Sequence, residues 1–266
     1  MNEGTACCGA ENRHAILAVL PARFASTRFP GKMLTPIAGK PLIWHTYMRT
    51  CQATLVTDVI VATDDVRIRE ALEPFGAKVM MTRDDHSSGT DRIAEVASAS
   101  DADIIVNVQG DEALIDPHTI DDTIRPLLDD PTVPMATARR LISDPTEVAD
   151  PSIVKVVCDR RGRALYFSRW PIPAIRDADH LGREGGTPPC HWQHIGIYVF
   201  RRDFLMQYAA WEPTPLEGLE KLEQLRVLEH GHAIAVVDTE YQSIGVDTPE
   251  DVARVEAILG GDYIYG

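Results

Sequence analysis

An apolar run over residues 15–20 that leads directly into a basic loop over residues 21–32 constrains the fold more than any other feature of this chain. An unbroken apolar run of this length is typical of a buried strand. Pro21 and the Pro30-Gly31 pair restrict the course of the loop that follows. The loop carries three cationic side chains, Arg23, Arg28 and Lys32. The sequence therefore predicts a buried strand that ends in a cationic loop.

This loop predicts a binding site for a polyanion. Ligands of open α/β sheets bind beyond the carboxyl ends of the strands, which is where the three cations are expected to lie. A guanidinium group binds phosphate oxygens through a planar fork, and an ammonium group acts as a mobile point charge. Two arginines and one lysine therefore suit a triphosphate better than a lone carboxylate. An ordinary solvated basic loop is the alternative interpretation.

Length and composition limit the class of protein. The chain has 266 residues, of which 44% are hydrophobic and 25% charged, so it can bury a full core. We expect a flexible tail over residues 1–14 and a single domain over residues 15–262.

The formal net charge of −14 disfavours nucleic acid as a partner. No apolar run approaches the roughly 20 residues that span a bilayer, and residues 1–14 lack the apolar core of a signal peptide. These features predict a cytoplasmic protein without a membrane partner, and five scattered cysteines are typical of reduced thiols.

Strand and helix signals alternate along the chain, which predicts an α/β fold with a mostly parallel twisted sheet flanked by helices. The expected strands in the first half are residues 58–62, 77–80 and 103–108, and the expected helices are residues 42–52, 65–74 and 93–98. The middle of the chain departs from this alternation, with short strands expected over 133–141, 152–158 and 164–167. A stretch rich in proline and glycine follows over 171–189. We expect an insert over about residues 160–200 that forms a lid or a dimerisation subdomain.

Acidic residues occur where a ligand site is expected. Asp111 follows the strand predicted over residues 103–108, and Asp247 precedes the last predicted helix. Magnesium prefers oxygen ligands and usually enters through one or two carboxylates together with substrate phosphates. We therefore expect Asp111 and Asp247 to bind Mg²⁺. The alternatives are an acid in a turn at Asp111 and a helix cap at Asp247.

Two further stretches are compatible with a ligand or with ordinary packing. Small hydroxyl side chains and Gly89 in the turn over residues 84–92 leave room for a flat base, although they also suit the start of a helix. Period-two alternation over residues 193–200 puts His194 and Tyr198 on one side of a strand, where they contact a ligand or the core.

A helix is expected over residues 216–230, with leucines along one face. Glu223 and Gln224 on this helix face either a cleft or water.

Together, the motifs resemble those of the cytidylyltransferases that activate 3-deoxy-manno-octulosonate (Kdo), in their order and approximate spacing along residues 15–259. The motifs are PARFASTRFPGK, MTRDDHSSGTDR, NVQGDE, KVVCD with ALYFSRWPIP, HIGIYVF, LEGLEKLEQLR and GVDTPEDV. The resemblance implies a fold like that of the nucleotide-diphospho-sugar transferases, a homodimer and transfer of CMP from CTP to the sugar acid. Pyrophosphate leaves, and Mg²⁺ is the cofactor.

The resemblance also implies roles for individual residues. The nucleotide-binding set is Arg23, Arg28, Lys32, Arg83, Ser88 and Gln109, and the catalytic set is Lys32, Arg28 and Asp111. The metal ligands are Asp111 and Asp247. The acceptor-binding set is Arg169, His194, Tyr198, Glu223 and Gln224. Attack by an acceptor oxygen on the α-phosphorus builds charge on phosphate oxygens, so Mg²⁺ and cationic side chains can supply most of the catalysis.

Two departures from the family pattern lie near the acceptor side. Ala113 follows the QGDE motif where the family usually has proline, and Arg139 stands where the family usually has small or apolar residues. Arg139 beside Arg169 would favour a small, multiply ionised acceptor such as phosphonoformate over a polyhydroxylated one. The other acceptor residues keep the pattern for a sugar acid. We therefore expect Kdo as the acceptor, with a phosphonate, 8-amino-Kdo or a nonulosonic acid as alternatives.

Two other classes of function are less compatible with the sequence. A metal-dependent glycosyltransferase usually carries a paired-acid motif, which this sequence lacks. A non-catalytic nucleotide-binding regulator would be expected to lose Lys32, Asp111 or Asp247, and all three are present.

Overall fold

A computed structural model describes residues 14–24, 29–176, 190–242, 244–246 and 248–262 of the chain. The predicted tail over residues 1–14 therefore falls almost entirely outside the described residues. Within the described part, no helix has both the length and the apolar character required to cross a membrane.

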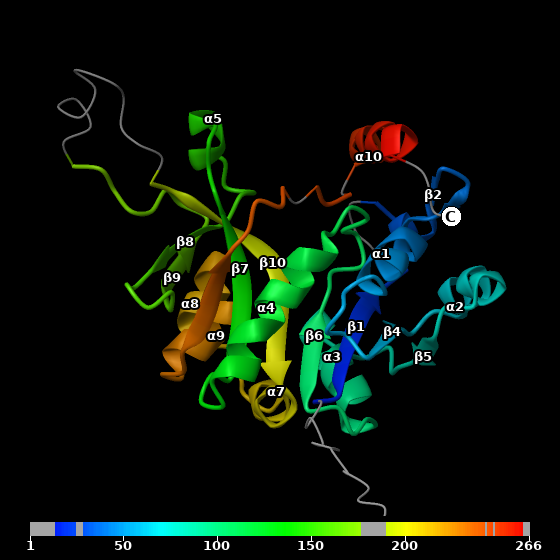
Figure 1. Ribbon diagram of the computed structural model, residues 1–266, viewed down its shortest axis with the longest axis horizontal. Coiled ribbons are helices and arrows are strands. Elements are labelled where there is room, and N and C mark those ends of the chain that lie inside the picture. The colour runs from blue at the N-terminus through cyan, green and yellow to red at the C-terminus, as the bar shows by residue number, and fades with distance from the viewer. Residues whose placement is uncertain (1–13, 25–28, 177–189, 243, 247, 263–266) are drawn as a thin grey trace, which may run out of the picture.

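A nine-stranded mixed sheet forms the centre of the molecule (Figure 1), and its main path runs β11-β7-β10-β6-β1-β4-β5. The strands of this path are β1 (Ile16–Ala22), β4 (Asp58–Thr63), β5 (Val79–Met81), β6 (Ile104–Asn107), β7 (Met135–Leu141), β10 (Trp192–Arg201) and β11 (Ile234–Asp238). Two more strands, β8 (Lys155–Cys158) and β9 (Ala164–Ser168), form a hairpin that pairs with β10. A separate small ribbon joins β2 (Pro36–Ile37) to β3 (Lys40–Pro41).

Helices cover both faces of this sheet. The helices of the described residues are α1 (Leu42–Thr50), α2 (Val66–Leu72), α3 (Gly89–Ser98), α4 (Pro117–Asp129), α5 (Pro145–Val148), α7 (Arg202–Ala209), α8 (Pro215–Glu220), α9 (Gln224–Glu229) and α10 (Pro249–Asp262). Two short 3-10 helices, η1 (Lys32–Leu34) and η2 (Glu73–Phe75), are also present. Figure 1 shows α8 and α9 beside β8 and β9 at one end of the sheet, and α2 with β5 at the other end.

Strand β1 is apolar along its length because it is buried on both faces. Ile16, Ala18 and Leu20 belong to the core cluster that includes side chains of α1 and α4. Leu17 and Val19 belong to the cluster on the other face, with side chains of α3 and α7. A strand covered on both faces has no solvent side on which polar residues are favoured.

The predicted α/β class with a mostly parallel sheet and flanking helices is confirmed. Strands β6, β1, β4 and β5 pair in parallel, as do β7 and β11. The prediction missed that β10 enters the middle of the sheet antiparallel to both β6 and β7. The last part of the expected insert, residues 192–200, therefore lies in β10 of the main sheet, and residues 177–189 lie outside the described part.

The helix expected over residues 216–230 is wrong as a single element. It is divided into α8 and α9, and Lys221 between them has the left-handed backbone angles φ 55° and ψ 47°. Leucine spacing in the sequence is compatible with one helix because the leucines recur at helical intervals on both sides of the break. The two sides differ in burial: Leu219 is 81% exposed, whereas Leu222 and Leu225 are buried.

A close approach between the end of β1 and the loop after β6 requires a residue without a side chain at Gly110. A Cβ atom there would lie 2.8 Å from Cδ1 of Ile43 on α1 and 3.0 Å from the carbonyl oxygen of Pro21 in β1. The Thr46 hydroxyl also donates a 2.9 Å hydrogen bond to the Gly110 carbonyl. The loop after β6 is therefore fixed against the end of β1 and against α1 at this point.

We expect Gly110→Ala to lower the free energy of unfolding by about 1–3 kcal/mol, because the backbone oxygen of Pro21 cannot yield without moving β1. Urea denaturation followed by circular dichroism measures the change. Gly218→Ala is the matched control: Gly218 lies in α8 with no other atom within 4 Å of its Cβ position, so alanine should stabilise the chain by about 0.5–1 kcal/mol. Equal stability of Gly110→Ala and the wild type would contradict the close approach.

Candidate active site

The cationic loop after β1 meets the acidic loop after β6. Because β1 and β6 pair in parallel, their carboxyl ends lie at the same edge of the sheet. Nζ of Lys32, at the start of η1, lies 2.5 Å from Oδ2 of Asp111. Their side chains are 11% and 24% exposed, so the pair is partly shielded from water. This pairing brings together two residues that the sequence assigned separately to phosphate and metal binding.

Arg23 connects the same loop to the turn that precedes α3. Its Nη2 donates a 2.8 Å hydrogen bond to the carbonyl oxygen of His86. The imidazole of His86 contacts the carboxylate of Glu95 on α3, and this carboxylate also accepts a 3.1 Å hydrogen bond from the backbone N–H of Arg83. Arg28, the third predicted cation, lies outside the described residues.

The two predicted nucleotide residues in this turn have local partners. Ser88 is the N-cap of α3: its hydroxyl accepts a hydrogen bond from the Asp91 N–H, and the Asp91 carboxylate accepts one from the Ser88 N–H. This is the helix-start arrangement that the sequence left as an alternative. Arg83 is exposed, and its Nε lies 3.2 Å from the carboxylate of Asp85.

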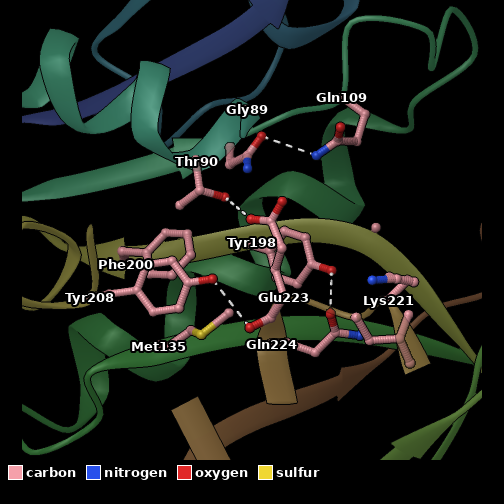
Figure 2. Close-up of a pocket in the computed structure, with 13 residues that line it drawn as sticks. Gly89, Thr90, Gln109, Met135, Tyr198, Phe200, Tyr208, Lys221, Glu223 and Gln224 are labelled. Carbon is pink, nitrogen blue, oxygen red and sulfur yellow. Dashed lines mark hydrogen bonds between the residues drawn. The ribbon is translucent and has the colours of Figure 1, made fainter. Parts of the chain in front are cut away.

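A cavity of about 250 Å³ opens next to this turn (Figure 2). Of the predicted residues, it is lined by Gln109, Tyr198, Glu223 and Gln224. The remaining lining residues are Gly89, Thr90, Asn107, Met135, Gly196, Phe200, Tyr208, Lys221 and Leu222. The cavity therefore lies between the start of α3, the end of β6, strands β7 and β10, helix α7 and the α8–α9 junction. Gln109 lies two residues before Asp111, so the cavity adjoins the Lys32–Asp111 pair along the chain.

Hydrogen bonds order the cavity wall, as Figure 2 shows. The Thr90 hydroxyl donates to Oε2 of Glu223 at 2.7 Å, and the Tyr198 hydroxyl donates to Oε1 of Gln224 at 3.2 Å. The Tyr208 hydroxyl donates to the backbone oxygen of Glu223 at 3.1 Å. Nε2 of Gln224 is buried without a hydrogen-bond partner in the described part of the chain. The wall therefore offers an amide donor, a carboxylate and a phenol to a polar ligand.

Burial changes the acidity of this wall. It raises the pKa of Glu223 above its ordinary value, although the hydrogen bond from Thr90 acts in the opposite direction. Burial also raises the pKa of Tyr198, and the nearby Glu223 carboxylate adds to this effect. Tyr198 is therefore a neutral hydrogen-bonding group at physiological pH.

His194 lies behind the cavity wall. Its Nε2 is 2.9 Å from the Thr137 hydroxyl, and its ring meets Phe167 edge-on with 4.9 Å between ring centroids. Burial lowers the pKa of His194 to about 3, because the charged imidazolium would lose its hydration. The imidazole is therefore neutral, and His194 does not lie among the residues that line the cavity.

The two predicted acceptor arginines also lie outside the cavity lining. Arg169 is held by backbone oxygens: Nε donates to Glu220 at 2.9 Å and Nη1 to Pro151 at 3.1 Å. Arg139 pairs with Asp238 on β11 at 2.7 Å, and its guanidinium carbon lies 4.0 Å from the ring centroid of Trp192. Arg139 is four residues along β7 from the cavity residue Met135, or about 13 Å at the rise of an extended strand. Arg139 therefore lies outside the lining of this cavity.

Asp111 is the one predicted metal ligand in the described residues, since Asp247 lies outside them. The backbone N–H of Val246 donates a 3.2 Å hydrogen bond to the carbonyl of Asp111, and the Tyr241 hydroxyl donates to Oε2 of Glu112 at 2.8 Å. The segment before α10 therefore lies against the loop that carries Asp111. Within the described part of the chain, no group of three His, Cys, Asp or Glu side chains is arranged to hold a metal by itself.

Several cavity residues gave no signal in the sequence. Tyr208 and Phe200 belong to apolar faces of α7 and β10, where aromatic side chains are ordinary core residues. Lys221 and Leu222 lie at a helix break that periodicity does not reveal. Thr90 and Gly89 belong to a turn that the sequence did identify as room for a ligand.

The amino-acid sequence is similar to those of known cytidylyltransferases. A family model described as cytidylyltransferase matches residues 17–234. A 3-deoxy-manno-octulosonate cytidylyltransferase of Solibacter usitatus is 54% identical over 251 residues, which cover 94% of this chain and 97% of that protein. One of Pelobacter propionicus is 57% identical over 243 residues, with coverage of 90% and 95%.

Solved structures are similar as well. The structure of a CMP:2-keto-3-deoxy-manno-octonic acid synthetase complexed with CTP matches this chain with a TM-score of 0.87 and 42% sequence identity. The match covers 94% of this chain and 100% of the chain of the synthetase. The structure of a 4-diphosphocytidyl-2C-methyl-D-erythritol synthase of Anaerococcus prevotii shares the fold at 14% identity, with a TM-score of 0.61 and coverage of 94% and 100%.

Neutral, buried His194 predicts a specific dependence of stability on pH. The unfolded chain binds a proton at an imidazole of pKa about 6.5, whereas the folded chain binds it only near pH 3. Stability from this residue is therefore present above pH 6.5 and is lost as pH falls toward 3, with a slope of up to about 1.4 kcal/mol per pH unit. We expect His194→Gln to show a shallower fall between pH 7.5 and 5 in urea denaturation. His118→Gln, at an exposed position of α4, is the control; identical pH slopes for His194→Gln and the wild type would refute the prediction.

Proposed function

The chain belongs to the 3-deoxy-manno-octulosonate cytidylyltransferase family, and from this we propose that it transfers CMP from CTP to Kdo, forming CMP-Kdo and pyrophosphate. The observation that carries the proposal in the structure is the adjacency of two parts. The Lys32–Asp111 pair lies at the carboxyl edge of the sheet, and Gln109, two residues before Asp111, lines a polar cavity. A phosphate-binding edge beside a polar cavity suits a reaction between a nucleoside triphosphate and a second, hydroxylated substrate.

On the nucleotide side, the proposal assigns the triphosphate to the loop after β1. Lys32 and Arg23, with Arg28 from the sequence, would neutralise phosphate oxygens. Arg83, Ser88 and Gln109 would lie against the cytidine, and the short side chains at the start of α3 leave room for a base. The acceptor hydroxyl oxygen forms a bond to the α-phosphorus while the bond from this phosphorus to pyrophosphate breaks. Lys32 contributes most where negative charge develops on the phosphates.

The carboxylate of Asp111 fits a magnesium site. It is a hard oxygen ligand, it is partly open to solvent, and its pairing with Lys32 holds it beside the loop proposed to bind the triphosphate. Asp111 and Asp247 would hold the ion together with phosphate oxygens of CTP, and when bound the ion would offset the charge of the triphosphate. Lys32 and Asp111 can also preserve each other's position before CTP binds.

The acceptor is a sugar acid in this proposal because the cavity is rich in groups that bind hydroxyls. Tyr198, Gln224 and the buried carboxylate of Glu223 line it, and Nε2 of Gln224 has no protein partner in the described residues. The guanidinium that would have favoured a compact phosphonate, that of Arg139, is held by Asp238 and Trp192. A polyhydroxylated acid therefore matches the cavity better than a small phosphonate.

Turnover with a panel of acceptors tests this proposal. We expect pyrophosphate release from CTP, and not from other nucleoside triphosphates, when Kdo is the acceptor. Phosphonoformate, 8-amino-Kdo and a nonulosonic acid serve as competing acceptors in the same assay. Turnover with phosphonoformate and none with Kdo would show that the proposed acceptor is wrong.

In the same assay, Asp111→Ala should lower kcat about 10²-fold or more, because one carboxylate of a shared metal site supports the transition state. Asp122→Ala, at an exposed acid of α4 that pairs only with Arg125 among the contacts described, is the matched control and should retain wild-type turnover. Full activity of Asp111→Ala at saturating Mg²⁺ would remove Asp111 from the mechanism.

We also infer a homodimer that forms through the β9–α8 end of the sheet. Leu165 on β9, Trp170 just after it and Leu219 on α8 are 61%, 76% and 81% exposed. The carboxylate of Glu220, next to Leu219, accepts hydrogen bonds from Ser168 and the Arg169 backbone, so these elements adjoin. Large apolar side chains that a chain leaves uncovered in one region are typical of an interface.

Sedimentation velocity at micromolar concentration should therefore give a dimer for the wild type and a monomer for the double variant Trp170→Glu, Leu219→Glu. The substituted charges would lose hydration in an apolar interface. Phe75→Glu replaces an exposed apolar residue at the opposite end of the sheet and should leave the dimer intact. A wild type that sediments as a monomer would overturn this inference.

A further inference from the structure

One wall of the cavity comes from the junction of two short helices. α8 ends at Glu220, Lys221 has left-handed backbone angles, and α9 starts at Gln224. Glu223 and Gln224 therefore reach the cavity from a break in the chain direction. Helices of six residues are marginal by themselves in water, and a left-handed lysine costs about 1–2 kcal/mol. The geometry of this junction must be imposed by tertiary contacts.

A buried ion pair spans the break. Nε of Arg226 on α9 donates to Oε2 of Glu217 on α8 at 2.7 Å, and Nη2 donates to Oε1 at 2.5 Å. The two side chains are 9% and 11% exposed. The remaining guanidinium nitrogen, Nη1, donates to the carbonyl of Trp211 at 3.1 Å. All three nitrogens of Arg226 are therefore engaged, and the two helices are joined by a pair of nearly parallel hydrogen bonds.

The ion pair also reaches the cavity through Tyr208. The guanidinium carbon of Arg226 lies 4.8 Å from the centroid of the Tyr208 ring, and the Tyr208 hydroxyl donates to the backbone oxygen of Glu223. The carboxylate of Glu223 is held from the opposite side by Thr90, as Figure 2 shows. Neither Glu217 nor Arg226 lines the cavity. The two charges therefore lie one residue behind the wall that they support.

We propose that the Glu217–Arg226 ion pair is a positioning device for the acceptor, which fixes the α8–α9 junction so that Glu223 and Gln224 face the cavity. This inference rests on the proposed function, because it takes the cavity as the acceptor site. A bidentate pair fixes the rotation of one helix relative to the other, whereas apolar contacts alone allow several packings of similar free energy. Burying both charges costs desolvation free energy, which offsets the attraction between them. The pair is therefore better explained by its effect on the geometry of the α8–α9 junction than by a contribution to the stability of the fold.

Arg226→Lys tests this positioning role because lysine keeps the positive charge and lacks the planar guanidinium group that makes two hydrogen bonds to Glu217. We expect the KM for Kdo to rise about tenfold while the KM for CTP changes less than twofold, since only the acceptor wall loses its alignment. Glu217→Gln keeps the side-chain shape and should give a smaller change in the same direction. A thermal melt shows whether Arg226→Lys folds. If it does not fold, the KM values of Glu217→Gln test the proposal in its place.

Arg140→Lys is the matched control. Arg140 pairs with Glu147 at 2.8 Å, its side chain is 11% exposed, and it joins β7 to α5 without contacting a cavity residue among the contacts described. A general loss of stability would affect both variants alike. An unchanged KM for Kdo in Arg226→Lys, an equal rise in the KM for CTP, or the same rise in Arg140→Lys would each overturn the proposal.

Hydrogen exchange measured by mass spectrometry gives a readout that needs no substrate. Amides of residues 221–224 should exchange at least several-fold faster in Arg226→Lys than in the wild type, and at the wild-type rate in Arg140→Lys. Unchanged exchange in Arg226→Lys would refute the positioning role. Failure of the wild type to turn over Kdo would instead refute the proposed function, and the exchange experiment would still decide whether the ion pair fixes the junction.

Discussion

The parallel pairing of β1 with β6 is the constraint on which the candidate site depends. It brings the carboxyl ends of two strands to one edge, so the loops with Lys32 and Asp111 meet although 79 residues separate them. Gly110 lets the loop after β6 approach the backbone at the end of β1. Opposite charges at this edge stabilise each other before any ligand is present, and the same charges suit phosphate and metal.

The other half of the site depends on β10, which runs antiparallel between β6 and β7. Its position places Tyr198 opposite Asn107 at the end of β6 and beside Thr137 of β7. The polar wall formed by Glu223 and Gln224 then closes against this strand from the α8–α9 junction. A rigid sheet therefore supplies one side of the cavity, and a junction held by a buried ion pair supplies the other.

A charged edge of the sheet next to a polar cavity suits a transfer reaction between two substrates. The triphosphate needs strong, fixed charges, which the edge of a parallel sheet provides without rearrangement. A sugar acid needs many directional hydrogen bonds, and their donors and acceptors must be held in one rotamer each. Thr90 and Tyr208 provide that order from within the wall, and the Glu217–Arg226 pair provides it from behind the wall.

The sequence by itself determined the α/β class and the family, and it singled out the cationic loop with Lys32 and the acid Asp111 as candidates, because these depend on short patterns: apolar runs, turn residues and motif order. Only the tertiary structure decided the partners of long side chains. Arg139 pairs with Asp238, 99 residues away, and His194 is buried beside Thr137. The break at Lys221 was equally hidden, because leucines at helical intervals indicate neither that a helix is continuous nor that each side chain is buried: Leu219 is 81% exposed and Leu222 is buried. Periodicity in the sequence indicates which face of a helix or strand is expected to be buried. A binding site depends on which side chains from distant parts of the chain lie next to one another, and periodicity does not contain that information.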